Sequence, residues 1–370
     1  MVIEPMRPHR VTLITGINIF FTGVAFASTT PYRAIIGIDE IGLSNADFGL
    51  IMALNAVGGA LISVFLGWLS DRVSDRRIIL LLCAFGGMFG FGIAWLVRNP
   101  LGFAMAFCLL IPFGNALFSQ SFSFARTFLD AFTPTRSELT LSFLRSGFTA
   151  AWVLTPPVAG LLAATTHDFV VFVIACSAHL ACLLLIIILV TVSDANMIAS
   201  PDARTDRKSD LATEIGIPKP YRLGVLGVTL SMTALHLNIS VLPLLIMKDL
   251  QGTFKQVGMN AAPAAIIEIP MIIGWGYLAL RVRKTSILAS SSLLFAIYFI
   301  LTANASNVLQ VMMFQVLAAA GISALLSINI SYLQEVMPGR VGLSTSLLDV
   351  TGVLAAVSAA VIFAANPWPI

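Results

Sequence analysis

Residues 67–77 read Gly-Trp-Leu-Ser-Asp-Arg-Val-Ser-Asp-Arg-Arg and form the only dense cluster of charges in the first 120 residues. An apolar run of about twenty residues precedes this cluster and another follows it, and each run is long enough to cross a bilayer as a helix. The cluster is therefore predicted to be a short loop between two membrane spans. Its three arginines predict that this loop faces the cytoplasm.

The composition indicates an integral membrane protein. Of the 370 residues, 58% are hydrophobic and only 11% are charged, whereas soluble proteins carry about 25% charged residues. No basic patch lies outside the membrane-flanking positions, so nucleic-acid binding is not expected. The four cysteines lie in apolar runs without metal-ligand spacing, so no metal site is predicted. No nucleophile–base set, phosphate-binding loop or ATPase motif is present, which predicts no enzyme activity and no cofactor.

The apolar runs predict eleven membrane spans in an all-α polytopic fold. The predicted spans are 11–30, 47–69, 78–97, 101–124, 138–163, 168–192, 222–247, 255–280, 285–304, 308–334 and 341–365. A polar linker, 193–221, separates a six-span half (1–192) from a five-span half (222–370). With the N-terminus in the cytoplasm, 17 of the 21 Lys and Arg residues fall on the cytoplasmic side, which predicts this orientation.

A degenerate internal repeat relates the two halves. Pro134-Thr-Arg136 recurs 204 residues later as Pro338-Gly-Arg340, and the same offset sets Arg145 opposite Asp349. Two similar halves joined by a cytoplasmic linker are typical of transporters. A six-plus-six design would need a twelfth span, so either the second half is shortened or eleven spans suffice.

The charged segment also carries a family resemblance. Its pattern Gly-x-x-x-Asp-Arg-x-x-x-Arg-Arg resembles the loop 2–3 signature of the major facilitator superfamily, with Ser74 where that signature has glycine. Several shorter segments resemble bacterial sugar efflux transporters. These are Asn55-Ala-Val57, Phe124-Ala-Arg126, Phe143-Leu-Arg145, Ala151-Trp-Val-Leu-Thr-Pro-Pro157, Glu268-Ile-Pro270 and Leu333-Gln-Glu-Val-Met-Pro-Gly-Arg340.

This resemblance implies a major facilitator fold of two pseudo-repeated helical halves in a bacterial inner membrane. It also implies export of sugars or sugar analogues by proton antiport with alternating access, and we expect a monomer. Two alternatives remain open. One is a proton-driven multidrug exporter, which the 25 Phe and 13 Met residues keep open. The other is a non-transporting membrane sensor or decayed relative.

In the family fold, spans 1, 4, 7 and 10 line a central cavity. Amide side chains there both donate and accept hydrogen bonds, which suits hydroxyl-rich solutes. Their alternative role is hydrogen bonding between helices, and for Trp152 the alternative to stacking on a sugar ring is simple packing. The predicted solute-binding residues are Asn18, Asn55, Asn115, Gln120, Trp152, His236, Asn238, Gln315 and Asn329.

Glu268 is the predicted proton-coupling residue, because a carboxyl group near the bilayer midplane is expensive and usually functional. Its alternative is a permanently protonated, hydrogen-bonded side chain. Arg145, seven residues into the span 138–163, is predicted to pair with Glu268 in one conformation and to separate from it in another. Asp349 and His236 are the next candidates for coupling, although such a histidine is more often a neutral core residue.

The loop is predicted to act as a gate. Gly67 would allow close helix approach. Asp71 would accept hydrogen bonds from the positive end of a neighbouring helix, near Gly342. Three arginines, Arg72, Arg76 and Arg77, would hold the neighbouring helix ends.

Overall fold

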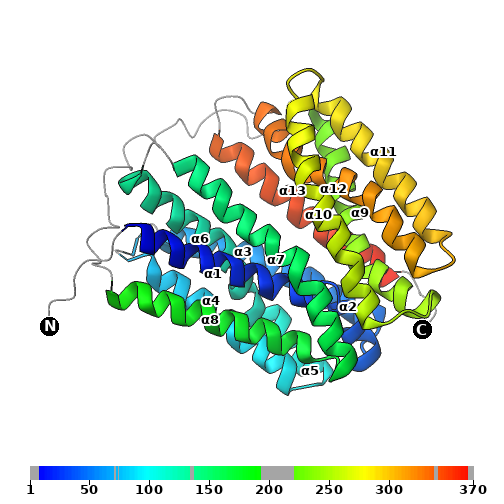
Figure 1. Ribbon diagram of the computed structural model, residues 1–370, viewed down its shortest axis with the longest axis horizontal. Helices are drawn as coiled ribbons and strands as arrows, with labels where there is room; N and C mark the ends of the chain where they lie inside the picture. Colours follow the sequence, from blue (N-terminus) through cyan, green and yellow to red (C-terminus); the bar gives the residue numbers. More distant parts are fainter. Residues whose placement is uncertain are drawn as a thin grey trace.

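The computed structural model describes residues 8–70, 72–73, 75–133, 137–192, 221–336 and 341–365, and this part of the chain is almost entirely helical (Figure 1). The first group of helices is α1 (Pro8–Thr29), α2 (Arg33–Ile35), η1 (Ile36–Glu40), α3 (Asn45–Ser70), α4 (Arg77–Leu96), α5 (Pro100–Met105), η2 (Ala106–Leu110), α6 (Ile111–Phe132), α7 (Ser137–Thr165) and α8 (Val170–Val192). The second group is α9 (Arg222–Leu244), η7 (Leu245–Asp249), α10 (Phe254–Leu278), α11 (Lys284–Ala303), α12 (Val308–Val336) and α13 (Val341–Ala365).

The long helices coincide with the predicted spans. Within the described residues, ten helical segments are long and apolar enough to cross a membrane, and α13 contributes a further apolar stretch, Val350–Ala365. Helices satisfy their backbone hydrogen bonds internally, as a lipid environment requires. The chain is therefore a multi-pass membrane protein with the predicted all-α fold.

Local sequence signals fix several helix starts. The Asn99 side chain accepts a hydrogen bond from the Gly102 N–H at the start of α5, and a capping box of Thr253 and Gln256 begins α10. Such caps satisfy backbone donors that a helix start leaves unpaired.

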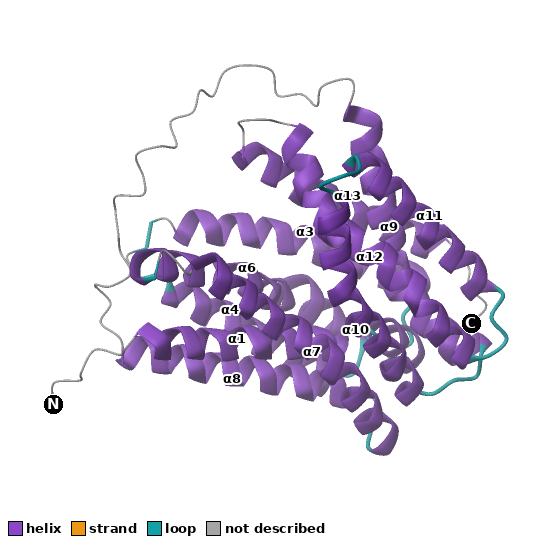
Figure 2. Cartoon of the chain, turned by 45° about the horizontal axis from the view of Figure 1, so that its top comes forward, coloured by secondary structure: helices purple, strands orange, loops and turns teal. Residues whose placement is uncertain are grey.

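The helices form two groups that diverge from one another (Figures 1 and 2). Buried clusters lie within each group, and a further buried cluster includes residues of both, such as Phe48 and Phe363. One of them joins α1, α4, α6 and α8, and another joins α9, α11 and α12. The two groups meet mainly through α7 with α10 and α3 with α13. The predicted linker 193–221 lies outside the described residues apart from Tyr221, so the exact domain boundaries stay a prediction.

Two ends of this assembly are distinguished below. The closed end is where α1 and α7 finish and where α3 and α10 begin. The open end is where α3 finishes and α7 begins, and it carries the charged segment 67–77.

Candidate functional site

A tyrosine joins the two helical groups at the closed end. Tyr32 is fully buried, and its hydroxyl donates to the Pro156 carbonyl oxygen of α7 at 2.8 Å. Its ring stacks on that of Phe254 at the start of α10, with the ring centroids 5.6 Å apart. The turn between α1 and α2 therefore contacts both groups.

Glycines allow the backbones to approach closely at this end. A Cβ atom on Gly160 of α7 would lie 2.5 Å from the Phe254 carbonyl oxygen. One on Gly49 of α3 would lie 2.6 Å from the Ala360 carbonyl oxygen of α13. Gly258 of α10 is equally close to the Pro156 carbonyl oxygen. Any larger residue would separate the helices at these points.

Charged groups also meet at the closed end. Lys248 of η7 pairs with Asp39 of η1 at 2.8 Å, and both side chains are partly exposed. Burial raises the pKa of the neighbouring Glu40, and the charge and hydrogen bond of Asp168 raise it further. This end therefore combines an ion pair between the groups with a close pair of carboxyls.

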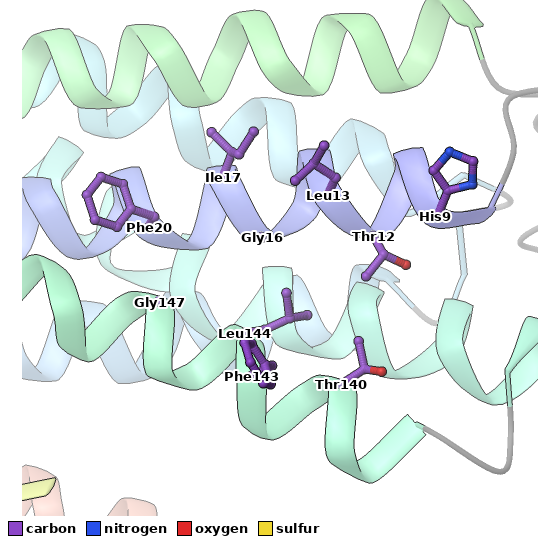
Figure 3. Close-up of a pocket in the computed structure, with 10 residues that line it drawn as sticks. All are labelled: His9, Thr12, Leu13, Gly16, Ile17, Phe20, Thr140, Phe143, Leu144 and Gly147. Carbon is purple, nitrogen blue, oxygen red and sulfur yellow. The ribbon is translucent and has the colours of Figure 1, made fainter.

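The helices are far less tightly packed at the open end. Cβ atoms added to Gly67 of α3, Gly147 of α7, and Gly274 and Gly276 of α10 would have no neighbour within 4 Å. A cleft of about 630 Å³ lies between the open-end halves of α1 and α7, and Figure 3 shows its mainly apolar lining, with His9, Thr12 and Thr140 as its polar members. This cleft lies within the first group, and it is the divergence of the two groups (Figures 1 and 2) that leaves the molecule closed at one end and open at the other.

The described part of the charged segment holds helices of the first group. The Arg77 guanidinium is buried, pairs with Asp75 at 2.8 Å and donates to the Leu189 carbonyl oxygen of α8. Arg76 donates to the Thr127 hydroxyl of α6 at 2.7 Å, and Arg72 lies over the Trp68 ring. Burial alone would raise the pKa of Asp75, but the hydrogen bonds and charge of Arg77 outweigh it and lower that pKa.

The predicted gating roles remain predictions. Asp71 lies outside the described residues, as do the side chains around Gly342. A Cβ atom on Gly67 would have no neighbour within 4 Å among the described residues. The close helix approach predicted at Gly67 would therefore have to occur in a different conformation of the protein.

The predicted amides of the first group hydrogen-bond within that group. Asn18 of α1 donates to the Ser121 hydroxyl of α6 at 2.9 Å. Asn55 of α3 donates to the Phe107 carbonyl oxygen at 2.5 Å, and Asn115 donates weakly to Asn55 at 3.5 Å. Gln120 is buried. These contacts fit the alternative role of holding helices together, and solute binding by these residues stays a prediction.

A second polar network lies inside the other group. Gln315 of α12 donates to Asn260 at 3.2 Å and to the Tyr298 hydroxyl at 3.3 Å, and that hydroxyl donates to Asn238 of α9 at 3.1 Å. Asn329 is fully buried, and its amide has no hydrogen-bond partner among the described residues. Four helices thus share one network, of which the sequence singled out only Asn238 and Gln315.

The predicted coupling pair spans the two groups. Glu268 of α10 is half-buried and Arg145 of α7 is exposed. They are close enough to interact electrostatically, yet none of the ion pairs among the described residues joins them. Trp152 is half-buried on α7, and the Asp349 side chain lies outside the described residues. This geometry does not test the coupling role, which stays a prediction.

Comparison with known proteins identifies the family. Residues 11–221 match the sequence profile of the Major Facilitator Superfamily. The chain belongs to the Major Facilitator Superfamily. Members of this superfamily are membrane transporters, so the predictions of family, fold and absence of enzyme activity are confirmed.

Its relatives in the superfamily include named sugar exporters. A "putative sugar efflux transporter" of Deinococcus radiodurans is 27% identical over 364 residues, covering 98% of this chain and 91% of the relative. "Sugar efflux transporter C" of Escherichia coli is 28% identical, covering 89% and 82% respectively. A solved structure of the nucleoside transporter NupG, in a mutant form, superposes with a TM-score of 0.79 at 10% identity, covering 95% of this chain and 90% of the other. This last match shows the fold alone.

One polar feature of this Major Facilitator Superfamily member was missed from the sequence. Arg33 follows α1 and was not singled out in the sequence, but its Nε atom is buried without a hydrogen-bond partner among the described residues. It interacts electrostatically with His236 of α9, which is half-buried. The sequence feature that could have indicated this burial is the position of Arg33, three residues beyond an apolar run, where the chain can turn inward at the helix end.

Proposed function

We propose that this chain exports sugars or closely related polar solutes from a bacterial cytoplasm in exchange for protons. The observation that carries this proposal is the asymmetry of the two ends, with the helical groups joined at one end and separated at the other. Alternating access requires such a pair of states. The names of the relatives support a sugar as the solute.

The orientation follows from the charges. The open end carries Arg72, Arg76 and Arg77, and positively charged loops face the cytoplasm. The described conformation would then be open to the cytoplasm and ready to accept a solute. In this orientation the N-terminus is cytoplasmic, and the protein lies in the inner membrane as a monomer.

Glu268 and Arg145 provide a route for proton coupling. In proton antiport, Glu268 must take up a proton on the outer side and release it to the cytoplasm as the solute binds. Arg145 interacts electrostatically with Glu268 in the described, cytoplasm-open conformation and would stabilise the ionised carboxylate there; in the opposite conformation, loss of that interaction would let Glu268 take up a proton from outside. Trp152 on the same helix as Arg145, together with the cavity amides, would hold the sugar. Proton release would then accompany solute binding.

Transport by purified protein in proteoliposomes tests this proposal. We expect a pH gradient to drive uphill accumulation of labelled sugar, and Glu268→Gln to abolish accumulation while counterflow exchange continues. Glu335→Gln is a matched control, since Glu335 is an exposed carboxylate paired with Lys284 at a helix end. Uphill pumping by the Glu268 variant with unchanged pH dependence would refute its role and favour Asp349 or His236.

A proton-driven multidrug exporter is the second candidate. It is supported by the mainly apolar cleft of Figure 3 and by the "multidrug resistance protein MdtG" of Enterobacter lignolyticus, 28% identical over half of this chain. The same proteoliposomes loaded with cationic dyes would distinguish it. A failure of any solute to move under any gradient would favour a membrane sensor.

A further inference from the structure

The closed end contains a buried cation that the proposed transport cycle leaves without a role. Arg33 begins the short helix α2, directly after Tyr32. Its Nη2 atom donates to the Thr30 hydroxyl at 2.5 Å, and its Nε atom has no partner among the described residues. Burial lowers the pKa of Arg33 to about 10, so the guanidinium remains charged at neutral pH.

This charge has no counter-charge in an ion pair among the described residues. None of the ion pairs between described residues includes Arg33. The C-terminal end of α1 offers a partial negative charge of about half a unit, which leaves the cation incompletely balanced. Unpaired charges in such surroundings are expensive and are usually retained for function.

Hydrogen-bonding groups surround the guanidinium. Arg33, Thr29, Asn115 and His179 line a small space between α1, α6 and α8, with aromatic and aliphatic side chains forming the rest of its wall. The space measures about 10 Å³, close to the volume that one water molecule needs. Part of the Arg33 side chain stays accessible, so a ligand can contact it from outside this space.

We propose that Arg33 binds a carboxylate of the transported solute, and hence that the exported sugars are sugar acids. This inference rests on the proposed export function and adds the class of substrate to it. A guanidinium presents paired donors that match a carboxylate. The unpaired Nε is one such donor, and Asn115, whose amide donates weakly to Asn55, lines the same small space.

A carboxylate fits this site better than a phosphate does. One guanidinium balances one negative charge, whereas a phosphate monoester carries up to two at neutral pH. No second Arg or Lys is among the described residues that line the space. The position of Arg33 also links solute binding to the transport cycle, because the adjacent Tyr32 contacts both α7 and α10 at the closed end.

Binding measurements on the full chain in lipid nanodiscs test the inference. The probes are glucuronate, glucose and glucose 6-phosphate, each titrated by calorimetry against the wild type, Arg33→Gln and Arg33→Lys. Arg98→Gln is the matched control, since it removes a cation from a loop at the same end, where Arg98 lies over the Phe169 ring. Melting temperatures establish that each variant is folded.

We expect the wild type to bind glucuronate more tightly than glucose. Arg33→Gln should weaken glucuronate binding by about tenfold or more, the usual effect of losing one hydrogen bond to a charged group, and leave glucose binding unchanged. Arg33→Lys should retain part of the preference, and Arg98→Gln all of it. If Arg33→Gln proves unfolded, the Lys variant decides: a reduced preference for glucuronate over glucose in that folded variant supports recognition by the guanidinium, and an unchanged preference overturns the inference.

Other outcomes separate this inference from the proposed function. If glucose is exported but glucuronate shows no Arg33-dependent advantage, the sugar-acid assignment fails and export stands. If glucose 6-phosphate binds more tightly than glucuronate, the assignment of a carboxylate as the ligand of Arg33 is overturned in favour of a phosphate. If the wild type neither binds nor moves any sugar, the proposed function fails, and the inference fails with it.

Discussion

The close backbone approach at Gly160 predicts that a single methyl group will open the closed end. In the described conformation, a Cβ atom at this position would lie 2.5 Å from the Phe254 carbonyl oxygen and 2.6 Å from the Tyr32 hydroxyl. Ordinary van der Waals contact begins at 3.4 Å. In Gly160→Ala, the helices α7 and α10 must therefore move apart by the difference, close to 1 Å in this direction.

The size of the effect follows from the contacts that this movement breaks. The stacking of Tyr32 on Phe254 contributes about 1 kcal/mol, and the long hydrogen bond from the Tyr32 hydroxyl to the Phe254 carbonyl oxygen, at 3.5 Å, adds about 0.5 kcal/mol. Losing both would shift the equilibrium toward the opposite conformation by about 1.5 kcal/mol, or roughly tenfold. The gain in helix propensity from Gly to Ala applies to both conformations and cancels.

Pulsed electron spin resonance between labels at Thr166 and Gln251 would measure this shift, since both residues are exposed and flank α7 and α10 at the closed end. Gly160→Ala should enlarge the population with the longer distance. The control is Gly147→Ala on the same helix, where the added Cβ would have no neighbour within 4 Å, and there the distances should stay as in the wild type. An unchanged distribution in Gly160→Ala, or equal shifts in both variants, would refute the reasoning.

Three further outcomes are expected. Asp75→Asn should lower the stability of the first helical group by about 2 kcal/mol, measured by thermal unfolding in detergent, because the buried Arg77 would lose its charged hydrogen bonds to Asp75. Since the pKa of Asp75 is lowered on folding, its contribution is present above about pH 4 and is lost as the pH falls through the lowered value; a wild type with the same acid sensitivity as the variant would contradict this. Asp39→Asn should weaken the closed end by only about 0.5 kcal/mol, because its pair with Lys248 is partly exposed, and the effect should vanish at high salt. Gln315→Leu should cost about 2 kcal/mol of stability by leaving its buried partners unsatisfied, and a melting temperature equal to that of the wild type would exclude the network as a source of stability.

The spans were predictable because the bilayer imposes both their length and their composition. The apolar runs located all of the long helices, and the errors lie at their ends. The run 101–124 ends at the first charged residues, but α6 continues to Phe132. Its last two turns carry Arg126 and Asp130, which are exposed and lie close together, so the helix extends beyond the apolar segment into polar surroundings. Hydropathy locates only the apolar part of a helix, so it could not predict the polar last turns of α6.

The contacts of the candidate site were less predictable. Span position correctly indicated that Asn18 and Gln315 are polar groups inside the helical groups, but it could not choose between a solute and another helix as their partner. That choice depends on helix rotation, which brings Ser121 to Asn18 and Asn260 to Gln315. The burial of Arg33 was not predictable for a related reason. A charge just beyond a span normally faces water, and only the turn at Tyr32 directs it inward.

The distribution of polar contacts indicates how the chain could change conformation. Buried hydrogen bonds such as Asn18–Ser121 and Gln315–Asn260 join helices of the same group. Between the groups, the described contacts at the closed end are close glycine packing, the stacking of Tyr32 on Phe254, a buried apolar cluster that includes Phe48 and Phe363, and one partly exposed ion pair. These contacts are mainly apolar, whereas separating helices within a group would expose unsatisfied amides to lipid. The two groups are therefore expected to move as rigid bodies, with the glycines at the open end available for equally close packing in the opposite state.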